Sequence, residues 1–266
     1  MFESLFSKRK DNQYGWFGNF QSWAKVSEVA GGYQADVILE RTKDALLKVK
    51  NGEAAYERDS VVFDKKECPY SLLAFLQLSA TLKKKPLHVL DFGGSLGSTY
   101  FQIKDFLPEN VCASWNVVEQ PHYVDCGNEH FADEILKFYK SIDECKAEKE
   151  IGFVLLSGSV QYLEKPHEFL QHLMAHNFDF LLFDRTAFNN KPDDRLTLQV
   201  VPPSIYPASY PSWFFNEEFF LSHFEKHYKI VAEFPSYVEG EPVMYIDEKP
   251  SGINKGFYLI NLSLHA

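Results

Sequence analysis

The sequence has little of what membrane proteins, secreted proteins and nucleic-acid-binding proteins need. No apolar run approaches the roughly 18 residues of a membrane-spanning helix, and the N-terminus lacks the apolar segment of a signal peptide. The four cysteines are dispersed and form no Cys-x-x-Cys pair. There are 27 lysines and arginines against 37 aspartates and glutamates, which gives a formal net charge of −10. We therefore expect a cytoplasmic protein with reduced thiols, no membrane span and no nucleic-acid partner.

Two nucleotide-binding patterns and a metal-binding pattern are missing as well. Without a Gly-Lys-Ser/Thr sequence the chain has no phosphate-binding loop of the NTPase type. The dinucleotide pattern G-x-G-x-x-G fails because Ser95 and Ser98 occupy its second and third glycine positions, which disfavours NAD-dependent oxidoreduction. To hold a metal, Asp184 would need further carboxylates close to it. The expected strand before it, at 153–157, ends in Ser157 and not in a carboxylate. We expect no metal site.

The 266 residues suffice for one α/β domain with an appendage. In residues 1–85 apolar side chains recur at helical spacing, which predicts an N-terminal helical cap. In residues 86–266 short β-rich runs alternate with helical segments, which is typical of a doubly wound sheet. We expect about seven strands, the last two as an antiparallel hairpin: 88–91, 116–119, 137–139, 153–157, 180–184, 229–234 and 256–262.

The most informative segment is VLDFGGSLGSTY, at residues 89–100. An apolar strand ends in Asp91, a glycine-rich turn follows, and a helix can begin at Ser98. Glycines allow a sharp turn and close approach of a ligand to the backbone, and the N–H groups at a helix start can bind an anionic group. Taking every second residue gives Asp91, Gly93, Ser95 and Gly97. That spacing looks like the acidic-x-Gly-x-Gly-x-Gly signature of class I S-adenosylmethionine (SAM) methyltransferases, with serine at the middle glycine.

A second element lies about 20 residues further on, at WNVVEQ. It predicts a short buried strand that ends in Glu119, where a carboxylate suits hydrogen bonding to ribose hydroxyls. The alternative is a solvated carboxylate without a ligand. Together the two elements indicate SAM as the bound nucleotide. The predicted cofactor-binding residues are Asp91, Gly93, Gly94, Ser95, Gly97, Glu119, Gln120 and Ser157.

Candidate acceptor-binding residues follow the later strands. Asp184 and Arg185, at a strand tip, either contact a substrate or form a structural ion pair. The segment QVVPPSIYPASYPSWFF, at 199–215, combines four prolines with aromatic residues and favours neither a helix nor a central strand. As part of an insertion at about 188–215 it would either overhang the site, where rings stack on sugars, or pack on the N-terminal helices. We predict substrate contacts from Arg58, Arg185, Tyr206 and Trp213, and a proton acceptor among Asp184, His122 and Tyr210.

The ordered segments GYQADVI, GEAAYERDSVVFD, VLDFGGSLGSTYF, WNVVEQPHYV, LKFYKSI, LLSGSVQYLEKP, FDRTAF and VPPSIYPASYPSWFF resemble a family of bacterial SAM-dependent methyltransferases. Its members are often encoded among surface-polysaccharide and O-antigen genes. The resemblance extends from about Trp16 to Phe257 and departs at Ala187, where the family more often has proline. It implies a class I methyltransferase sheet and leaves the acceptor open.

The leading hypothesis is methyl transfer from SAM to an oxygen or nitrogen of a small molecule, with a sugar or glycan precursor as acceptor. The main alternative is a non-catalytic binding or scaffold protein of glycan assembly that has kept the fold. It draws on Ser95 at the middle glycine position and on the lack of an obvious base.

Overall fold

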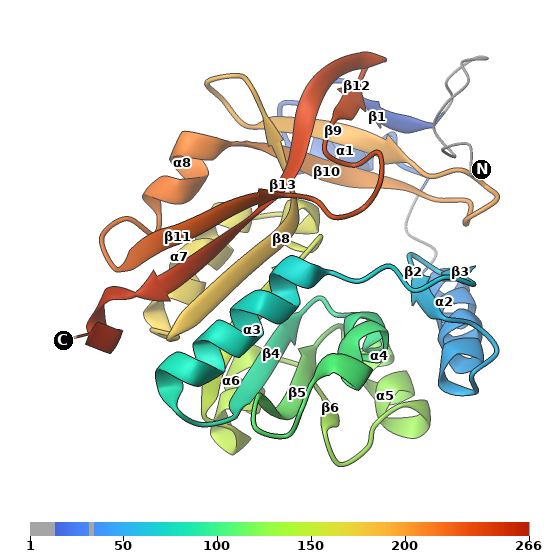
Figure 1. Cartoon of the computed structure of the whole chain (residues 1–266). Helices are drawn as coiled ribbons and strands as arrows, with labels where there is room; N and C mark the ends of the chain where they lie inside the picture. The colour runs from blue at the N-terminus through green and yellow to red at the C-terminus, as the bar shows by residue number, and fades with distance from the viewer. Residues whose placement is uncertain (1–13, 32–34, 266) are drawn as a thin grey trace.

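Seven strands lie side by side in the computed structural model, which describes residues 14–31 and 35–265 (Figure 1). Their order is β6-β5-β4-β7-β8-β13-β11, and β13 alone runs antiparallel to its neighbours. All seven predicted strands, and the antiparallel pairing of the last two, are confirmed. The bounds are β4 Leu87–Phe92, β5 Cys112–Val118, β6 Leu136–Tyr139, β7 Ile151–Ser157, β8 Phe180–Asn189, β11 Tyr228–Pro235 and β13 Lys249–Asn261.

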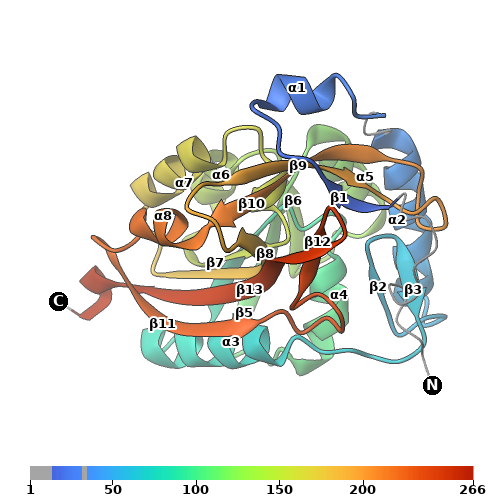
Figure 2. The same ribbon diagram turned by 90° about the horizontal axis from the view of Figure 1, so that it is seen from above.

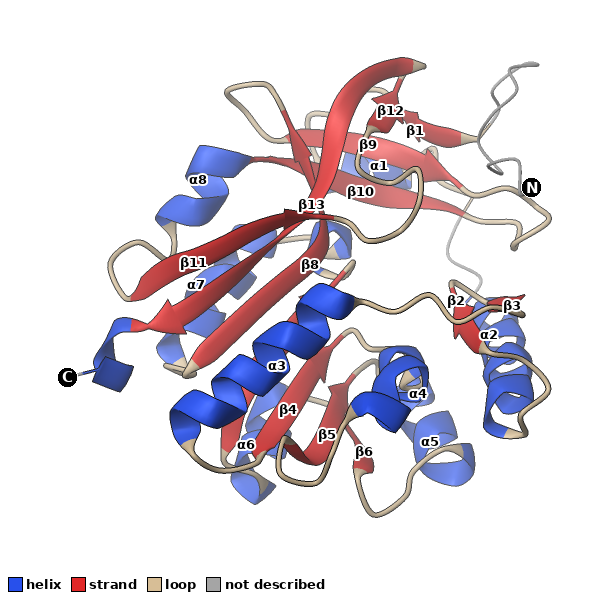
Figure 3. Ribbon diagram, viewed as in Figure 1, coloured by secondary structure: helices blue, strands red, loops and turns tan. Residues whose placement is uncertain are grey.

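Helices cover both faces of this sheet (Figure 3). One face packs against α3 (Tyr70–Lys83), α4 (Ser98–Ile103) and α5 (Pro121–His130), and the other against α6 (Ile142–Glu148), α7 (Pro166–Ala175) and α8 (Glu217–Ser222). Neighbouring strand residues such as Val89 and Leu90 belong to different cores, because side chains alternate along a strand. The result is the expected α/β sandwich.

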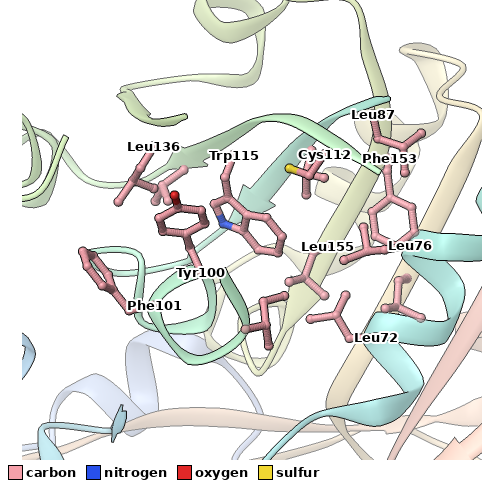
Figure 4. Close-up of a cluster of buried hydrophobic side chains, with 14 of the residues drawn as sticks. Leu72, Leu76, Leu87, Tyr100, Phe101, Cys112, Trp115, Leu136, Phe153 and Leu155 are labelled. Atoms are coloured by element: carbon pink, nitrogen blue, oxygen red, sulfur yellow. The ribbon is translucent and has the colours of Figure 1, made fainter. Parts of the chain in front are cut away.

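The N-terminal segment is less helical than expected. It contains α1 (Trp23–Ser27) and α2 (Ala35–Lys50), but also the strands β1 (Gly15–Phe17), β2 (Tyr56–Arg58) and β3 (Val61–Phe63). Its last helix, α3, packs on the sheet through Leu72 and Leu76, at a spacing that puts both on one face (Figure 4). Residues 1–13 and 32–34 of the predicted cap lie outside the described residues.

Six strands pair in a closed ring beside the main sheet (Figure 2). The ring runs β8-β13-β12-β1-β9-β10 and returns to β8, so β8 and β13 belong to both the ring and the sheet. This sharing explains why both strands extend beyond their predicted bounds of 180–184 and 256–262. The remaining members are β9 (Arg195–Val200), β10 (Ser209–Asn216) and β12 (Met244–Ile246).

The expectation that 199–215 forms no central strand is wrong for its second half, which forms most of β10. Pro211 lies opposite Leu198 of β9, while β8 pairs with β10 only at Phe215 and Asn216. Pro211 therefore has one neighbouring strand, and a proline is tolerated where no partner needs its N–H. The other three prolines lie in the connection between β9 and β10. None of the described helices is both long and apolar enough to cross a membrane.

Candidate active site

The carboxyl ends of β5, β4 and β7 lie at one edge of the sheet, level with Asp184 of β8. The expectation that Asp184 and Arg185 lie at a strand tip is wrong, because β8 continues into the ring as far as Asn189. Gly93, just after β4, donates its N–H to the Val118 carbonyl of β5 at 2.9 Å. On the other side of β4, Gly158 after β7 donates to the carbonyl of Asp184 in β8, also at 2.9 Å. The chain turns to opposite sides of β4 here, and ligands of doubly wound sheets bind at such switch points. The predicted site residues on these four strands therefore share one edge.

The glycine-rich turn after β4 requires its glycines at two positions. Gly93 has φ +71°, and a Cβ there would lie 2.7 Å from the Cβ of Ser159. A Cβ on Gly94 would lie 2.5 Å from the carboxyl carbon of Asp91. Ser95, at the middle glycine position, adopts φ +56°, the left-handed conformation that a glycine would take. The serine thus preserves the path of the turn.

Asp91 supports this turn from below. Its side chain is buried, and its Oδ2 accepts a hydrogen bond from Trp115 Nε1 at 3.0 Å. Burial raises the pKa of Asp91 to about 7, although the bond from Trp115 acts in the opposite direction. Because the carboxyl also lies against Gly94, Asp91 holds the turn in place from the protein side.

Glu119 follows β5 and faces the turn. Its carboxylate accepts hydrogen bonds from the backbone N–H groups of Gln120, at 2.7 Å, and Ser95. Burial raises its pKa, and these two bonds oppose the increase. Gln120 is exposed and precedes the first turn of α5, which begins with a proline. The structure thus joins the two elements that the sequence analysis treated together.

Two buried polar atoms near the turn have no hydrogen-bond partner among the described residues. They are Ser159 Oγ, whose residue packs against Gly93, and His122 Nε2, in the first turn of α5 after Glu119. An unpaired buried polar group costs about 1–3 kcal/mol. Both atoms are therefore available to a ligand that carries hydrogen-bonding groups. Ser159 was not among the predicted residues, although it lies two positions after Ser157.

Asp184 and Arg185 do not form an ion pair with each other. The Arg185 guanidinium binds both carboxylate oxygens of Glu241, at 3.0 and 2.7 Å, and also Asp59 at 3.2 Å. Asp184 is buried, and its carboxylate accepts the backbone N–H of Arg185 at 2.9 Å. Burial raises the pKa of Asp184 to about 6, and the charge of Arg185 opposes the increase.

The hairpin of β2 and β3 contacts two parts of this edge of the sheet. Glu57, in β2, is buried and accepts hydrogen bonds from Ser98 Oγ, at the start of α4, and from Ser60 N. Asp59, in the turn of the hairpin, binds Arg185. The hairpin therefore connects the helix after the glycine-rich turn to the middle of β8. Glu57 and Glu241 were both missed, since nothing local in the sequence links either residue to these strands.

Arg58 lies in the same hairpin but is already engaged. Its Nη1 binds Glu67 Oε2 at 2.6 Å, and its guanidinium lies 5.1 Å from the ring centre of Phe63. The predicted substrate contact by Arg58 remains untested. Its charge is largely balanced within the protein.

The predicted aromatic residues divide into two groups. The hydroxyls of Tyr206 and Tyr210 lie 3.3 Å apart, and Tyr162 meets the Tyr210 ring edge-on. Tyr206 and Tyr210 share a small core with Ile38 of α2, so this part of the segment packs on an N-terminal helix. Trp213 instead donates its indole N–H to the Leu163 carbonyl at 3.1 Å and packs with the core beneath α7 and α8. The structure does not bring Trp213 together with Tyr206.

Among known proteins, only solved structures are similar to this chain. Neither the known protein families nor the curated proteins contain a match to this chain. Similar structures include SAM-dependent methyltransferases. One from Clostridium acetobutylicum shares 8% identity over 71% of this chain and 89% of its own, with a TM-score of 0.44. The amino pentose methyltransferase CalS10 of Micromonospora echinaspora, solved with SAM, shares 10% identity over 71% and 90%, with a TM-score of 0.43.

A third similar structure is the N-terminal domain of EvdMO1, solved in the presence of SAH and D-fucose. It shares 12% identity over 86% of this chain and 97% of its own, with a TM-score of 0.46. At such low identities and TM-scores the assignments below depend on the strand order and on the residues of the site. Among residues 14–31 and 35–265, no group of three or more His, Cys, Asp or Glu side chains is placed to hold a metal ion.

Glu57 makes the stability of the protein depend on pH. Burial raises its pKa from 4.5 to about 7, so between these values the unfolded chain is ionised while the folded chain keeps the proton. The folded state then binds more protons, and stability falls as the pH rises from 4.5 to 7, by about 3 kcal/mol for this group. We expect Glu57→Gln to remove this part of the slope in urea unfolding series, and Glu129→Gln, at an exposed position, to retain it. Equal slopes for the two variants would contradict the assignment.

Proposed function

We propose that this protein is a SAM-dependent methyltransferase that acts on an oxygen or nitrogen of a small molecule, with a sugar or glycan precursor as acceptor. One observation carries the proposal. The turn after β4 has left-handed backbone at Gly93, Ser95 and Gly97, and it faces Glu119 at the end of β5. The three left-handed residues are spaced two apart along the turn. Such a turn opposite a carboxylate fits a mononucleoside at the switch point of the sheet.

The residues of this edge suit SAM. Glu119 would hold the ribose hydroxyls, and Ser159 Oγ and His122 Nε2 are buried atoms that lack partners among the described residues. The N–H groups after the turn would face an anionic group of the ligand. When bound, SAM supplies a methyl group activated by its sulfonium. The protein then has to place the acceptor in line with that methyl and exclude water.

Asp184 is the best placed of the three proposed proton acceptors. It lies in β8 beside Ser157 at the end of β7, and with a pKa of about 6 it is mostly ionised at neutral pH yet able to take a proton. Burial raises the pKa of Tyr210 well above its ordinary value of 10, so Tyr210 keeps its proton and serves as a donor. His122 lies beside Glu119 on the nucleoside side of the site. We assign proton removal to Asp184.

The acceptor side favours a ring-shaped molecule. Tyr162, which is exposed, and Tyr210 meet edge to face near the hairpin residue Asp59, which influences the pKa of both. Tyr206 is buried in the core with Ile38, and its hydroxyl lies 3.3 Å from that of Tyr210. Aromatic rings of this kind pack against the flat faces of sugars. The family resemblance supports the same class, because its members are often encoded among polysaccharide genes. A role in surface-polysaccharide assembly is part of this proposal.

The scaffold alternative loses its main support from the sequence. It relied on Ser95 in place of the middle glycine and on the lack of an obvious base. Ser95 adopts the backbone conformation of a glycine, and Asp184 offers a base. We therefore favour the enzyme.

Titration with S-adenosylhomocysteine (SAH) tests the nucleoside site. We expect one SAH per chain, and binding 10- to 100-fold weaker in Glu119→Ala, because charged hydrogen bonds contribute about 1.5–3 kcal/mol. Glu129→Ala, at an exposed position of α5, should bind like the wild type. If the wild type binds no SAH, or if Glu119→Ala binds it equally well, the proposal is wrong.

A further inference from the structure

Polar side chains surround Asp184 and Arg185, in the middle of β8. We call this group the β8 cluster: Asp59, Gln161, Asp184, Arg185, Glu241 and Asn254. Asn254 donates its Nδ2 to Glu241 at 3.1 Å, and Gln161 donates its Nε2 to the Arg185 carbonyl at 3.0 Å. A carboxylate and a carbonyl can only accept, so these partners fix which end of each amide is the oxygen.

The two remaining amide oxygens, Asn254 Oδ1 and Gln161 Oε1, are buried and have no partner among the described residues. Both side chains belong to residues that are 5% exposed. Each oxygen lies on the same amide as a nitrogen bonded to Arg185 or to its ion-pair partner Glu241, so both belong to the surroundings of Arg185 in the middle of β8. A donor-bearing ligand would satisfy them.

The charge around the cluster is negative as well. The cations nearby are already paired: Arg185 with Glu241 and Asp59, and Arg58 with Glu67. Lys255, further along β13, is bonded to Glu217 and Glu233. Among the described residues, no cation forms an ion pair with the buried Asp184 carboxylate. An anion placed here would meet acceptors and carboxylates, whereas a cation would be stabilised.

We propose that the β8 cluster receives a protonated amine, so that the acceptor is an amino compound, such as an amino sugar, and the methyl group goes to its nitrogen. An ammonium group has three N–H donors, and the cluster offers it the buried Asp184 carboxylate and the two amide oxygens of Gln161 and Asn254 that lack partners among the described residues. The same charge excludes a carboxylate or a pyrophosphate from this position. This inference rests on the proposed function and narrows its acceptor.

The transfer then balances as follows. The Asp184 carboxylate takes one proton from the bound ammonium, which frees the lone pair of the amine nitrogen. A nitrogen–carbon bond forms to the methyl group while the carbon–sulfur bond breaks, and its electron pair stays on sulfur. The products are a methylated ammonium and SAH, and Asp184 returns its proton to solvent.

Sugars with matched rings test the inference. Protein saturated with SAH is titrated with D-glucosamine, D-glucose and D-glucuronate, which differ in the charge of one substituent. We expect glucosamine to bind at least 10-fold more tightly than glucose, and glucuronate more weakly than both. In Asp184→Asn the preference for glucosamine over glucose should fall below about 3-fold, because a charged hydrogen bond is lost. Gln161→Leu should reduce the preference partly.

The SAH titration separates the two ways of failing. If SAH does not bind, the proposed function fails. If SAH binds but glucosamine shows no preference over glucose, or glucuronate binds equally well, or none of the three sugars binds, the amine assignment is overturned. Normal SAH binding by Asp184→Asn and Gln161→Leu shows that both variants are folded.

Discussion

Gly93→Ala is expected to weaken SAH binding by about 100-fold. At φ +71° the new Cβ strains the backbone by about 1–2 kcal/mol. It also lies 2.7 Å from the Cβ of Ser159, well inside the ordinary contact distance of 3.4 Å. Either the turn or the segment after β7 must move, and displacements approaching 1 Å at a site cost about 100-fold.

Gly52→Ala is a matched control for this prediction. Gly52 has φ +78°, nearly the same backbone conformation, but a Cβ there would meet nothing within 4 Å. Backbone strain should therefore cost both variants similar stability in urea unfolding, and the contact with Ser159 should cost Gly93→Ala more. Only Gly93→Ala should lose SAH affinity in calorimetry. If Gly93→Ala binds SAH as tightly as Gly52→Ala does, the turn is not the nucleoside site.

Asp184→Asn is expected to lower the rate of methyl transfer by 10²- to 10⁴-fold, the usual contribution of a positioned base. SAH affinity should change by less than about 3-fold, because Asp184 lies on the acceptor side of the edge. The amide keeps an oxygen for the backbone N–H of Arg185, so the fold should be retained. The assay follows SAH release, with glucosamine as the acceptor.

The pH profile of the rate distinguishes a base from a residue that only maintains structure. For the wild type we expect kcat/KM to rise with pH through an apparent pKa near 6, where the Asp184 carboxyl ionises. That limb should disappear in Asp184→Asn. Asp125→Asn, at the exposed surface of α5, should keep both the rate and the limb. An unchanged profile in Asp184→Asn would assign the proton to another group.

Local sequence patterns sufficed for the main sheet. Its strands are short apolar runs bounded by residues that favour turns. Consecutive residues of a strand, such as Val89 and Leu90, enter the two cores on opposite faces of the sheet, so the pattern that defines a strand is local. The turn after β4 and Glu119 were also predictable, because a glycine-rich turn and a carboxylate at the tip of the next strand are local features.

The ring of six strands was not predictable in this way. β1 and β12 have three residues each, too few to show any periodicity, and they pair across most of the length of the chain. Glu241 was missed for the same reason, since its partner Arg185 lies 56 residues away. Tertiary pairing decides these elements, and a single sequence does not display it.

A crystal structure of the protein with SAH bound would locate the nucleoside site. We expect the nucleoside at the edge between β4 and β5, with both ribose hydroxyls on the Glu119 carboxylate. We also expect a ligand atom within hydrogen-bonding distance of Ser159 Oγ, and the sulfur on the side of Asp184. SAH bound elsewhere on the protein, or at this edge without contact to Glu119, would contradict the assignment.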